Sequence, residues 1–185
     1  MSLKLKELVK ADLYRYYGRG SALLLIRSLL FNKGFKFIFW IRLSKAMNHI
    51  PVIKFLPRIM HYYYKRIYCS DIGFRHDIGP GFCFYHVFST AFSDGVILGD
   101  NVTLTHGVTL GHVNGFSPKI NNNVYIGPGA CIIGGITVGN NVVIGANAVV
   151  TKDIPDNAVV VGNPGKIISY NGSSASIENL YTKEL

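Results

Sequence analysis

Four of the six histidines in this chain lie within residues 71–119, and their imidazole rings are the first groups to consider for chemistry. A neutral imidazole, with an ordinary pKa of about 6.5, can take a proton from a hydroxyl group near neutral pH. In a fold built from repeats, a histidine is also often just a polar group on the outer surface, with no chemical role. Which of the histidines could accept a proton from a hydroxyl depends on the secondary-structure elements that position them. The four are His76, His86, His106 and His112.

The three cysteines offer weaker chemistry than the histidines. Cys69, Cys83 and Cys131 are odd in number and widely scattered, with the spacing of neither metal ligands nor a disulfide framework. Apolar neighbours flank Cys83 and Cys131, which favours core packing and a raised thiol pKa over thiol catalysis. Unpaired cysteines are typical of a reducing compartment, so we expect a cytoplasmic protein.

The elements that must position the histidines follow a six-residue repeat. Aliphatic residues recur at every sixth position from Ile120 to Val150, and shorter six-spaced sets run from Ile72 to Phe84 and from Leu98 to Leu110. Such a hexapeptide repeat predicts a β-helix, in which one aliphatic side chain per hexad fills the coil. Gly, Asn and Asp then form the turns at the corners of each coil, because they provide backbone freedom and side-chain hydrogen bonds. The alternative is chance spacing in an antiparallel protein, and six unbroken repeats argue against it.

The repeat slips twice, and both slips lie close to histidines. It shifts by two residues between Phe84 and Leu98, and by four residues between Leu110 and Ile120. Stacked coils leave no room inside, so inserted residues must bulge outward as loops, where functional sites are often built. His86 lies beside the first slip. We therefore expect the functional site at these two breaks.

Composition divides the chain at about residue 70. Residues 1–70 hold 14 lysines and arginines but only two acidic residues, a net charge of +12, whereas residues 71–185 have a net charge of −3. Helical spacing of apolar residues, punctuated by glycine and proline, predicts about four helices in residues 1–70. We therefore expect a basic, aromatic-rich helical region at 1–70, a β-helix at 71–168, and a flexible tail or cap at 169–185.

The basic helical region admits three interpretations. In the simplest, aromatic faces pack on one another and on the first coil, while lysine and arginine stay solvated. In the second, basic amphipathic helices adhere to an anionic membrane at its inner, cytoplasmic face. Nucleic-acid binding is the third, but the chain lacks the recognition module that it needs. No apolar run is long enough to span a bilayer, and the charged start predicts no signal peptide.

Several short motifs together resemble the serine acetyltransferase type of hexapeptide acyltransferase, over about residues 65–168. They are Asp71-Ile72-Gly73, Phe84-Tyr85-His86, Gly107 to Gly111, Pro118-Lys119-Ile120, and the ending from Ile144 to Pro164. The resemblance implies a mainly β fold, a left-handed parallel β-helix that assembles as a homotrimer. It also implies that acetyl-CoA binds in the groove between neighbouring subunits and that the acetyl group passes directly to a hydroxyl, with no metal.

The resemblance also implies a catalytic pair. The family's Asp-His pair falls on Asp71 and His86, and their separation of 15 residues is preserved. A carboxylate on the second ring nitrogen fixes the tautomer and stabilises the imidazolium that forms. The resemblance therefore implies His86 as the general base, oriented by Asp71. We expect a structural or acceptor-binding role for His106, and acceptor contact for His112.

The acceptor side departs from the serine-specific pattern. Enzymes for free serine carry an Arg-His pair immediately before Pro-Lys-Ile, and here those positions are Phe116 and Ser117. Without the arginine, the serine carboxylate loses charge-assisted hydrogen bonds worth about 1.5–3 kcal/mol each. An aromatic ring beside a hydroxyl suits a sugar, so we expect an acceptor sugar of a cell-surface polysaccharide, as in capsular and lipopolysaccharide O-acetyltransferases. The alternative is a serine O-acetyltransferase of cysteine biosynthesis.

Contacts to CoA are expected from small residues that line the groove, with two lysines meeting the phosphates as point charges. Both lysines could equally be solvated corners. The expected set is Gly111, Gly127, Pro128, Ala146, Lys152 and Lys166.

Two other classes of protein compete with this interpretation. One is a non-catalytic trimeric scaffold, against which the retained Asp71 and His86 argue. The other is a zinc enzyme of the carbonic anhydrase type, which requires three histidines that converge on one metal ion. His86, His106 and His112 are not spaced like that set.

Overall fold

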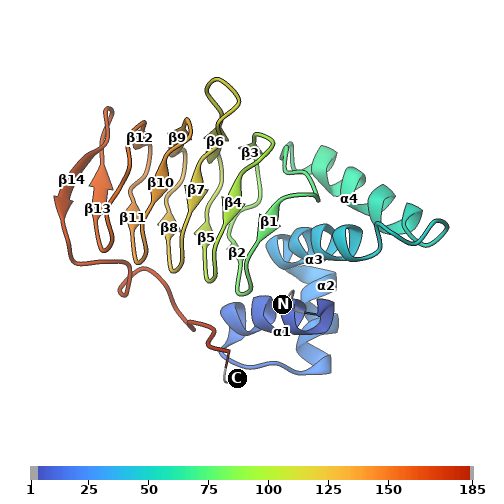
Figure 1. Cartoon of the computed structure of the whole chain (residues 1–185). Coiled ribbons are helices and arrows are strands. Elements are labelled where there is room, and N and C mark those ends of the chain that lie inside the picture. Colours follow the sequence, from blue (N-terminus) through green and yellow to red (C-terminus); the bar gives the residue numbers. More distant parts are fainter. Residues whose placement is uncertain (1–3, 184–185) are drawn as a thin grey trace.

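A computed structural model describes residues 4–183, in which a small helical part precedes a three-sided parallel β-helix (Figure 1). The number of helices expected in residues 1–70 is confirmed. They are α1 (Leu5–Tyr17), α2 (Ala22–Phe31), α3 (Lys33–Ala46) and α4 (Phe55–Ile67).

Local capping explains where these helices begin and end. Gly18 ends α1 in the left-handed conformation, with φ of 65°, which costs glycine no steric strain. The Ser21 hydroxyl accepts a hydrogen bond from the Leu24 N–H at 3.2 Å and caps α2. Asn32 caps α3 in the same way, because its Oδ1 accepts from the Phe35 N–H at 2.9 Å.

Short strands form the three sides of the β-helix, one sheet to a side. The first sheet contains β1 (Asp77–Ile78), β4 (Ile97–Leu98), β7 (Lys119–Ile120) and β10 (Thr137–Val138). The second contains β2 (Cys83–Phe84), β5 (Thr103–Leu104), β8 (Tyr125–Ile126), β11 (Val143–Ile144), β13 (Val159–Val161) and β14 (Lys166–Ser169). The third contains β3 (Ala91–Phe92), β6 (Thr109–Gly111), β9 (Cys131–Ile133) and β12 (Val149–Val150). Neighbouring strands pair in parallel, except that β14 is antiparallel to β13.

The hexad residues fill the interior, as the repeat predicts. Each of the six-spaced aliphatic residues from Ile120 to Val150 is at most 2% exposed, and Leu104 and Leu110 are fully buried. Burying a side chain of this size contributes about 1.5–3 kcal/mol, so the column of aliphatic side chains is the main source of the fold's stability. The predicted mainly β, parallel β-helical fold is confirmed.

A ladder of asparagines supports one corner of the coils, between the first and second sheets. Asn101, Asn123, Asn141 and Asn157 all have positive φ, and each side-chain amide of the first three donates to the next Oδ1, at 3.2, 2.9 and 3.1 Å. Asparagine tolerates the left-handed conformation better than most residues. The ladder therefore satisfies both the corner geometry and the side-chain amides.

The helices are joined to the first coil by buried polar contacts. Asp12 of α1 and Arg42 of α3 form an ion pair at 3.0 Å, and Asp12 also accepts from the Phe82 N–H at 2.9 Å. Gly34 lets α3 approach β2 closely, because a Cβ there would lie 1.8 Å from the Phe84 carbonyl oxygen. The helical part is thus packed closely against the β-helix.

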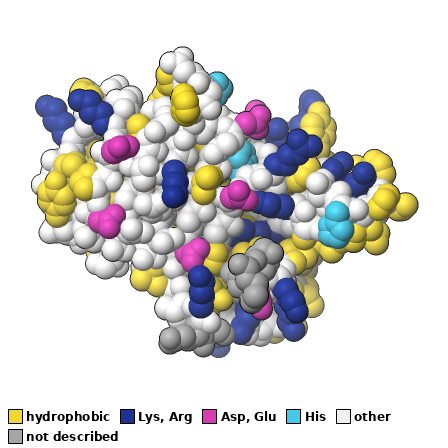
Figure 2. Space-filling model, in the orientation of Figure 1, with side chains coloured by type: hydrophobic (Ala, Val, Ile, Leu, Met, Phe, Trp, Pro, Cys, Tyr) yellow, Lys and Arg dark blue, Asp and Glu magenta, His cyan; other side chains and the backbone are white. Residues whose placement is uncertain are grey.

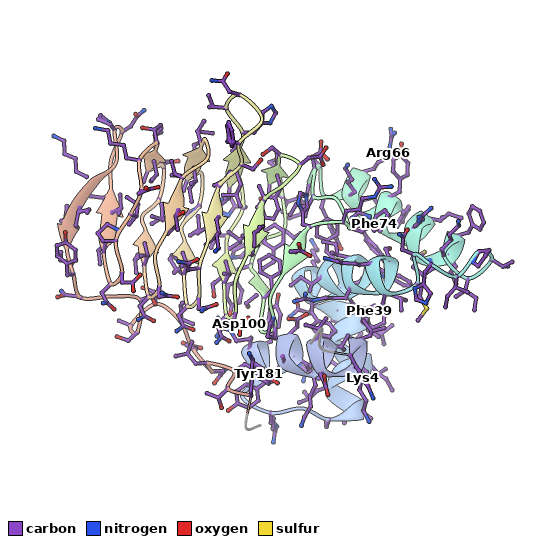
Figure 3. The ribbon with its side chains drawn as sticks, in the orientation of Figure 1. Lys4, Phe39, Arg66, Phe74, Asp100 and Tyr181 are labelled. Carbon is purple, nitrogen blue, oxygen red and sulfur yellow. The ribbon has the colours of Figure 1, made fainter. Side chains whose placement is uncertain are left out.

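Beyond β14 the chain turns back along the coils toward α1, and we call residues 170–183 the C-terminal strap (Figure 1). Its Ser173 hydroxyl donates to the Asn123 carbonyl at 2.6 Å, and its Tyr181 N–H donates to Asn101 Oδ1 at 3.0 Å. Figure 3 shows Tyr181 below Asp100, between the coils and the helices. The segment expected as a flexible tail or cap therefore lies along the asparagine ladder. None of the described helices is long and apolar enough to cross a membrane.

Candidate active site

His86 lies on an outward bulge of the first coil. Six residues separate β2 from β3, whereas four separate β5 from β6, although these strands pair in register. The two-residue slip is therefore located at this corner, between Phe84 and Ala91. His86 itself has a φ of 53°, in the left-handed region that few residues other than glycine and asparagine favour. The predicted position of the first break beside His86 is confirmed.

Two hollows meet at His86. The first, which we call the coil groove, has a volume of about 420 Å³ and is lined by Thr105, His106, Tyr125 and Pro128 of the next coils. Residues 175, 176 and 178 of the C-terminal strap also line it. His106 lies edge-to-face with His86, with ring centroids 5.9 Å apart. Two imidazoles thus stand at the mouth of one groove.

The second hollow, which we call the helix groove, has a volume of about 450 Å³ and separates the first coil from α1, α2 and α3. Aromatic rings and two cations line it together with His86. The aromatic and cationic side chains that line it, and that could contact a ligand, are Tyr16, Arg27, Phe31, Lys33 and Phe88. The Lys33 amine lies 5.3 Å from the centre of the Phe88 ring. Neither groove could be anticipated from the hexad, because both combine the coils with segments distant in the sequence.

One thiol and two phenol groups of this region stay neutral near pH 7. Burial raises the pKa of the Cys83 thiol to about 11, and burial also raises the pKa of the Tyr85 hydroxyl. The pKa of Tyr16 is raised by burial too, and its hydroxyl donates to the Phe84 carbonyl at 3.0 Å. A thiol with this pKa is a poor nucleophile near neutral pH, which agrees with the expected absence of thiol catalysis.

Asp71 is bonded to the end of the bulge that carries His86 and to α4. Its N–H donates to the Thr90 carbonyl at 2.7 Å, and its backbone bridges to Ala91 at the start of β3. The carboxylate, 73% exposed, forms an ion pair with Lys65 of α4. Within residues 4–183 of this single chain, the His86 ring has no hydrogen-bond partner, so the Asp71–His86 pairing stays a prediction.

The second slip forms a β-hairpin that projects from the coils (Figure 1). Val113 and Phe116 exchange backbone hydrogen bonds of 3.1 and 3.0 Å around Asn114 and Gly115, which have φ of 52° and 82°. Asn-Gly with two positive φ values is the preferred two-residue hairpin turn. The predicted outward loop is confirmed, and we call residues 112–117 the hairpin.

The three residues expected to contact the acceptor differ in their freedom to do so. His112 is exposed, and Phe116 is 70% exposed above Gly135. The Ser117 hydroxyl, by contrast, donates to the Asp94 carbonyl and thereby attaches the hairpin to the coil below. The Ser117 hydroxyl is therefore already hydrogen-bonded within the chain. Its position before Pro118 in the sequence did not indicate this contact.

The hairpin and His86 lie at different corners of the β-helix. His86 precedes the third sheet at the β2–β3 corner, whereas the hairpin follows that sheet at the β6–β7 corner. The structure therefore does not bring the predicted general base and the predicted acceptor loop together within one chain. A site that uses both requires the two corners to come from different copies.

The residues expected to bind CoA likewise lie in different parts of the β-helix. Strand register stacks Pro128 and Ala146 on the His86 and His106 corner, with Gly127 beside them. A Cβ at Gly127 would lie 2.8 Å from the Ala146 nitrogen, so coil stacking alone requires this glycine. Gly111 ends β6, and Lys152 follows β12 at the corner that carries the hairpin. Lys166 lies apart from both corners, in β14.

Sequence reasoning missed Arg15, which is 2% exposed and lines the coil groove. Its guanidinium donates to Thr103 Oγ1 at 2.6 Å, to the Gly81 carbonyl at 3.1 Å and to the Glu178 carbonyl of the strap. No local signal marks it, because all its partners are remote in the sequence. For the zinc alternative, no three His, Cys, Asp or Glu side chains within residues 4–183 converge as metal ligands in a single chain.

Comparison with known proteins gives a family match and serine acetyltransferases as relatives. Residues 117–152 match the family described as bacterial transferase hexapeptide (six repeats). A serine acetyltransferase of Helicobacter pylori is 34% identical over 145 residues, which cover 76% of this chain and 84% of that protein. A serine acetyltransferase of Buchnera aphidicola is 35% identical over 161 residues, 84% of this chain. This chain spans only 60% of the length of the Buchnera protein.

Solved structures agree with these relatives. The crystal structure of a serine acetyltransferase from Brucella abortus matches with a TM-score of 0.77 and 32% identity, covering 90% of this chain and 69% of that one. A Brucella abortus structure in complex with coenzyme A matches with the same TM-score, 31% identity and coverage of 90% and 68%. A serine acetyltransferase from Neisseria gonorrhoeae, in complex with serine, has a TM-score of 0.73, 32% identity and coverage of 89% and 69%.

Proposed function

Because this chain belongs to the serine acetyltransferase family of hexapeptide-repeat transferases, we propose that it transfers the acetyl group of acetyl-CoA directly to an acceptor hydroxyl. The observation that carries the proposal is the placement of His86 on an outward bulge where two grooves meet. One imidazole there can face a thioester from one groove and a hydroxyl from the other.

In the proposed reaction, neutral His86 accepts the proton of the acceptor hydroxyl as its oxygen attacks the thioester carbonyl carbon. The tetrahedral intermediate then collapses, its C–S bond breaks, and the CoA sulfur takes the proton back from the imidazolium. A positioned general base of this kind contributes about 10²- to 10⁴-fold in rate. Asp71 serves this step by orienting the ring, for which its carboxylate must exchange Lys65 for His86.

We place the complete site between two copies of the chain in a homotrimer. The opposite positions of the His86 corner and the hairpin corner support this arrangement, because one copy cannot supply both. The coil groove, with Pro128 and Ala146 on the His86 corner, is the proposed CoA wall. Lys152, at the hairpin corner of a neighbouring copy, could meet a phosphate there as a point charge.

L-Serine is the acceptor that we propose first. Relatives that span most of this chain are serine acetyltransferases, and one related structure holds serine. The comparisons thus favour serine over the polysaccharide sugar that we expected from Phe116 and Ser117, and none of the relatives reported above is a capsular or lipopolysaccharide enzyme.

A sugar remains the second candidate because of one observation in this chain. The helix groove beside His86 is lined by aromatic rings and by the cations Arg27 and Lys33. Aromatic rings suit the apolar face of a pyranose, and the cations suit a sugar that carries a carboxylate.

One assay separates the two acceptors. Release of free thiol from acetyl-CoA would be followed with L-serine, with neutral monosaccharides and with uronic acids. We expect saturable release with L-serine. Release with a sugar alone would overturn serine as the acceptor, and no release with any hydroxyl compound, together with no CoA binding, would overturn the transferase itself.

A further inference from the structure

We propose that the outward face of α4 adheres to the surface of an anionic lipid bilayer. We define this α4 face as the exposed apolar and aromatic side chains of α4 and the turn before it. They are Val52, Ile53, Phe55, Leu56, Ile59, Tyr62, Tyr63 and Ile67. The inference does not depend on the acetyl transfer proposed above.

The α4 face is an apolar stripe with no partner in the chain. Val52 is 81% exposed, Leu56 64% and Ile59 62%, and the other members are each at least half exposed. Along α4 they recur every three or four residues, which places them on one side of the helix. The opposite side carries buried Pro57 and His61 and packs on the protein.

The charge around the α4 face is mostly positive, and the exposed carboxylate of Asp71 is paired with Lys65 of α4. No acidic residue occurs between Asp12 and Asp71, whereas eleven lysines and arginines do. Asp12 is itself 1% exposed and paired with Arg42. Lys54 and Arg66 lie against the α4 face, 5.6 Å from the centre of the Phe55 ring and 5.8 Å from that of Tyr62, and Figure 3 shows Arg66 projecting away from the coils. Such cations meet lipid phosphates while neighbouring apolar groups enter the interface.

The position of α4 allows contact with a flat surface. Figure 1 places α4 and the turn before it at the end of the molecule farthest from β13 and β14. Figure 2 shows hydrophobic and basic side chains intermixed at this end, with little acidic surface among them. A bilayer could therefore approach the α4 face without meeting the acidic coils.

Among possible partners, an anionic bilayer satisfies both features of the α4 face. A second copy would bury the apolar stripe but would oppose two regions that each carry a net charge of +12. Nucleic acid would neutralise the cations but would leave Leu56 and Ile59 in water. Anionic lipid accommodates the cations and the apolar side chains at once.

The test is co-sedimentation of the full chain with phosphatidylcholine vesicles that contain or lack phosphatidylglycerol. We expect binding to the anionic vesicles, and at least about tenfold weaker binding to neutral ones. Ile59→Glu should lower the affinity for anionic vesicles by about tenfold or more. Ile168→Glu is the matched control, since Ile168 is also 62% exposed but lies in β14 at the other end, and it should bind as the wild type does.

Three results would overturn the proposal. The first is equal binding of wild type and Ile59→Glu, because the apolar stripe would then lie outside the contact. The second is no binding to either vesicle by a chain with native circular dichroism. In the third, Ile59→Glu changes the oligomeric state in light scattering, which would assign the α4 face to a second copy. Thiol release measured without vesicles should be unchanged in Ile59→Glu, so failure here is distinct from failure of the transferase.

Discussion

At the residue scale, His86 is positioned by its backbone and not by side-chain partners. The left-handed φ of 53° and the two inserted residues direct the peptide outward, while the following Val87 is buried. No described residue of the same chain hydrogen-bonds the His86 ring. The orientation of the ring is therefore left to groups that arrive from Asp71, from the substrate or from a neighbouring copy.

We expect His86→Ala to lower kcat for thiol release by at least about 10²-fold, because the acceptor hydroxyl loses its proposed general base. CoA affinity and the oligomeric state should not change. His106→Ala is the matched control, since its ring lies in the same groove one coil further along. The assignment is wrong if His106→Ala, and not His86→Ala, abolishes turnover.

A paired comparison tests Asp71 in the same assay. Asp71→Asn should lower kcat with little change in KM, because the His86 ring loses the group that selects its tautomer. Lys65→Met breaks the ion pair that Asp71 makes in the isolated chain, and it should leave kcat unchanged or raise it. Equal losses in the two variants would show that Asp71 serves only as the partner of Lys65.

At the scale of elements, α4 is joined to the first coil through a buried histidine. The His61 ring lies 2.9 Å from the Ile72 carbonyl oxygen and stacks on Phe37, with ring centroids 5.7 Å apart. Burial lowers the pKa of His61 below its ordinary value, so the folded protein holds the ring neutral. Burial lowers the pKa of His76 in the same way.

This contact predicts a pH dependence of stability. Below about pH 6.5 the unfolded chain binds a proton at His61 that the folded chain does not, so the free energy of unfolding should fall as the pH drops. His61→Gln should make that dependence shallower, with His76 supplying part of what remains. Urea unfolding at about pH 7.5 and about pH 5.5 measures both slopes. The same pH slope in wild type and variant would contradict the role given to His61.

The two corners that flank the third sheet carry different side chains. One corner stacks His86, His106, Pro128 and Ala146 in successive coils, and the other carries the hairpin and Lys152. Strands of the third sheet lie between the two corners in each coil, so the hairpin as it stands does not lie beside His86 of its own chain. Only the arrangement of whole chains can join them.

At the scale of the whole molecule, a shared site predicts complementation between inactive variants. Chains with His86→Ala would be mixed with chains that carry His112→Ala and Phe116→Ala, unfolded together and refolded. In random trimers about one quarter of the interfaces would join an intact His86 to an intact hairpin. We therefore expect about a quarter of wild-type thiol release from the mixture. Activity no greater than that of the two variants assayed separately would place the site within one chain.

The helices, the coils and the C-terminal strap converge on Arg15. Its guanidinium hydrogen-bonds Thr103 of β5, the Gly81 carbonyl of the first coil and the Glu178 carbonyl of the strap. The coil groove is thereby walled by three segments, of which only the coil belongs to the repeat. The strap also shields the asparagine ladder, so the end of the chain contributes to both the groove and the fold.

The sequence by itself determined the β-helix, the residues that fill it and the positions of both breaks. These follow from a local rule, because every sixth residue points inward whatever lies farther along the chain, and an inserted residue can only bulge outward. Phe84, Leu110 and Ile120 are buried where the repeat predicts, and His86 and the hairpin lie where it slips. The helical character of residues 1–70 followed from local periodicity in the same way.

Only the tertiary structure decided which of these residues share a corner. The Lys65–Asp71 ion pair, the Ser117 contact with Asp94 and the place of Arg15 each join segments that no short pattern relates. Contacts of this kind depend on how segments distant in the sequence pack together, and a repeat that acts within each coil does not encode that packing. The hairpin, although close in sequence to the proposed catalytic motifs, stands across the third sheet from His86.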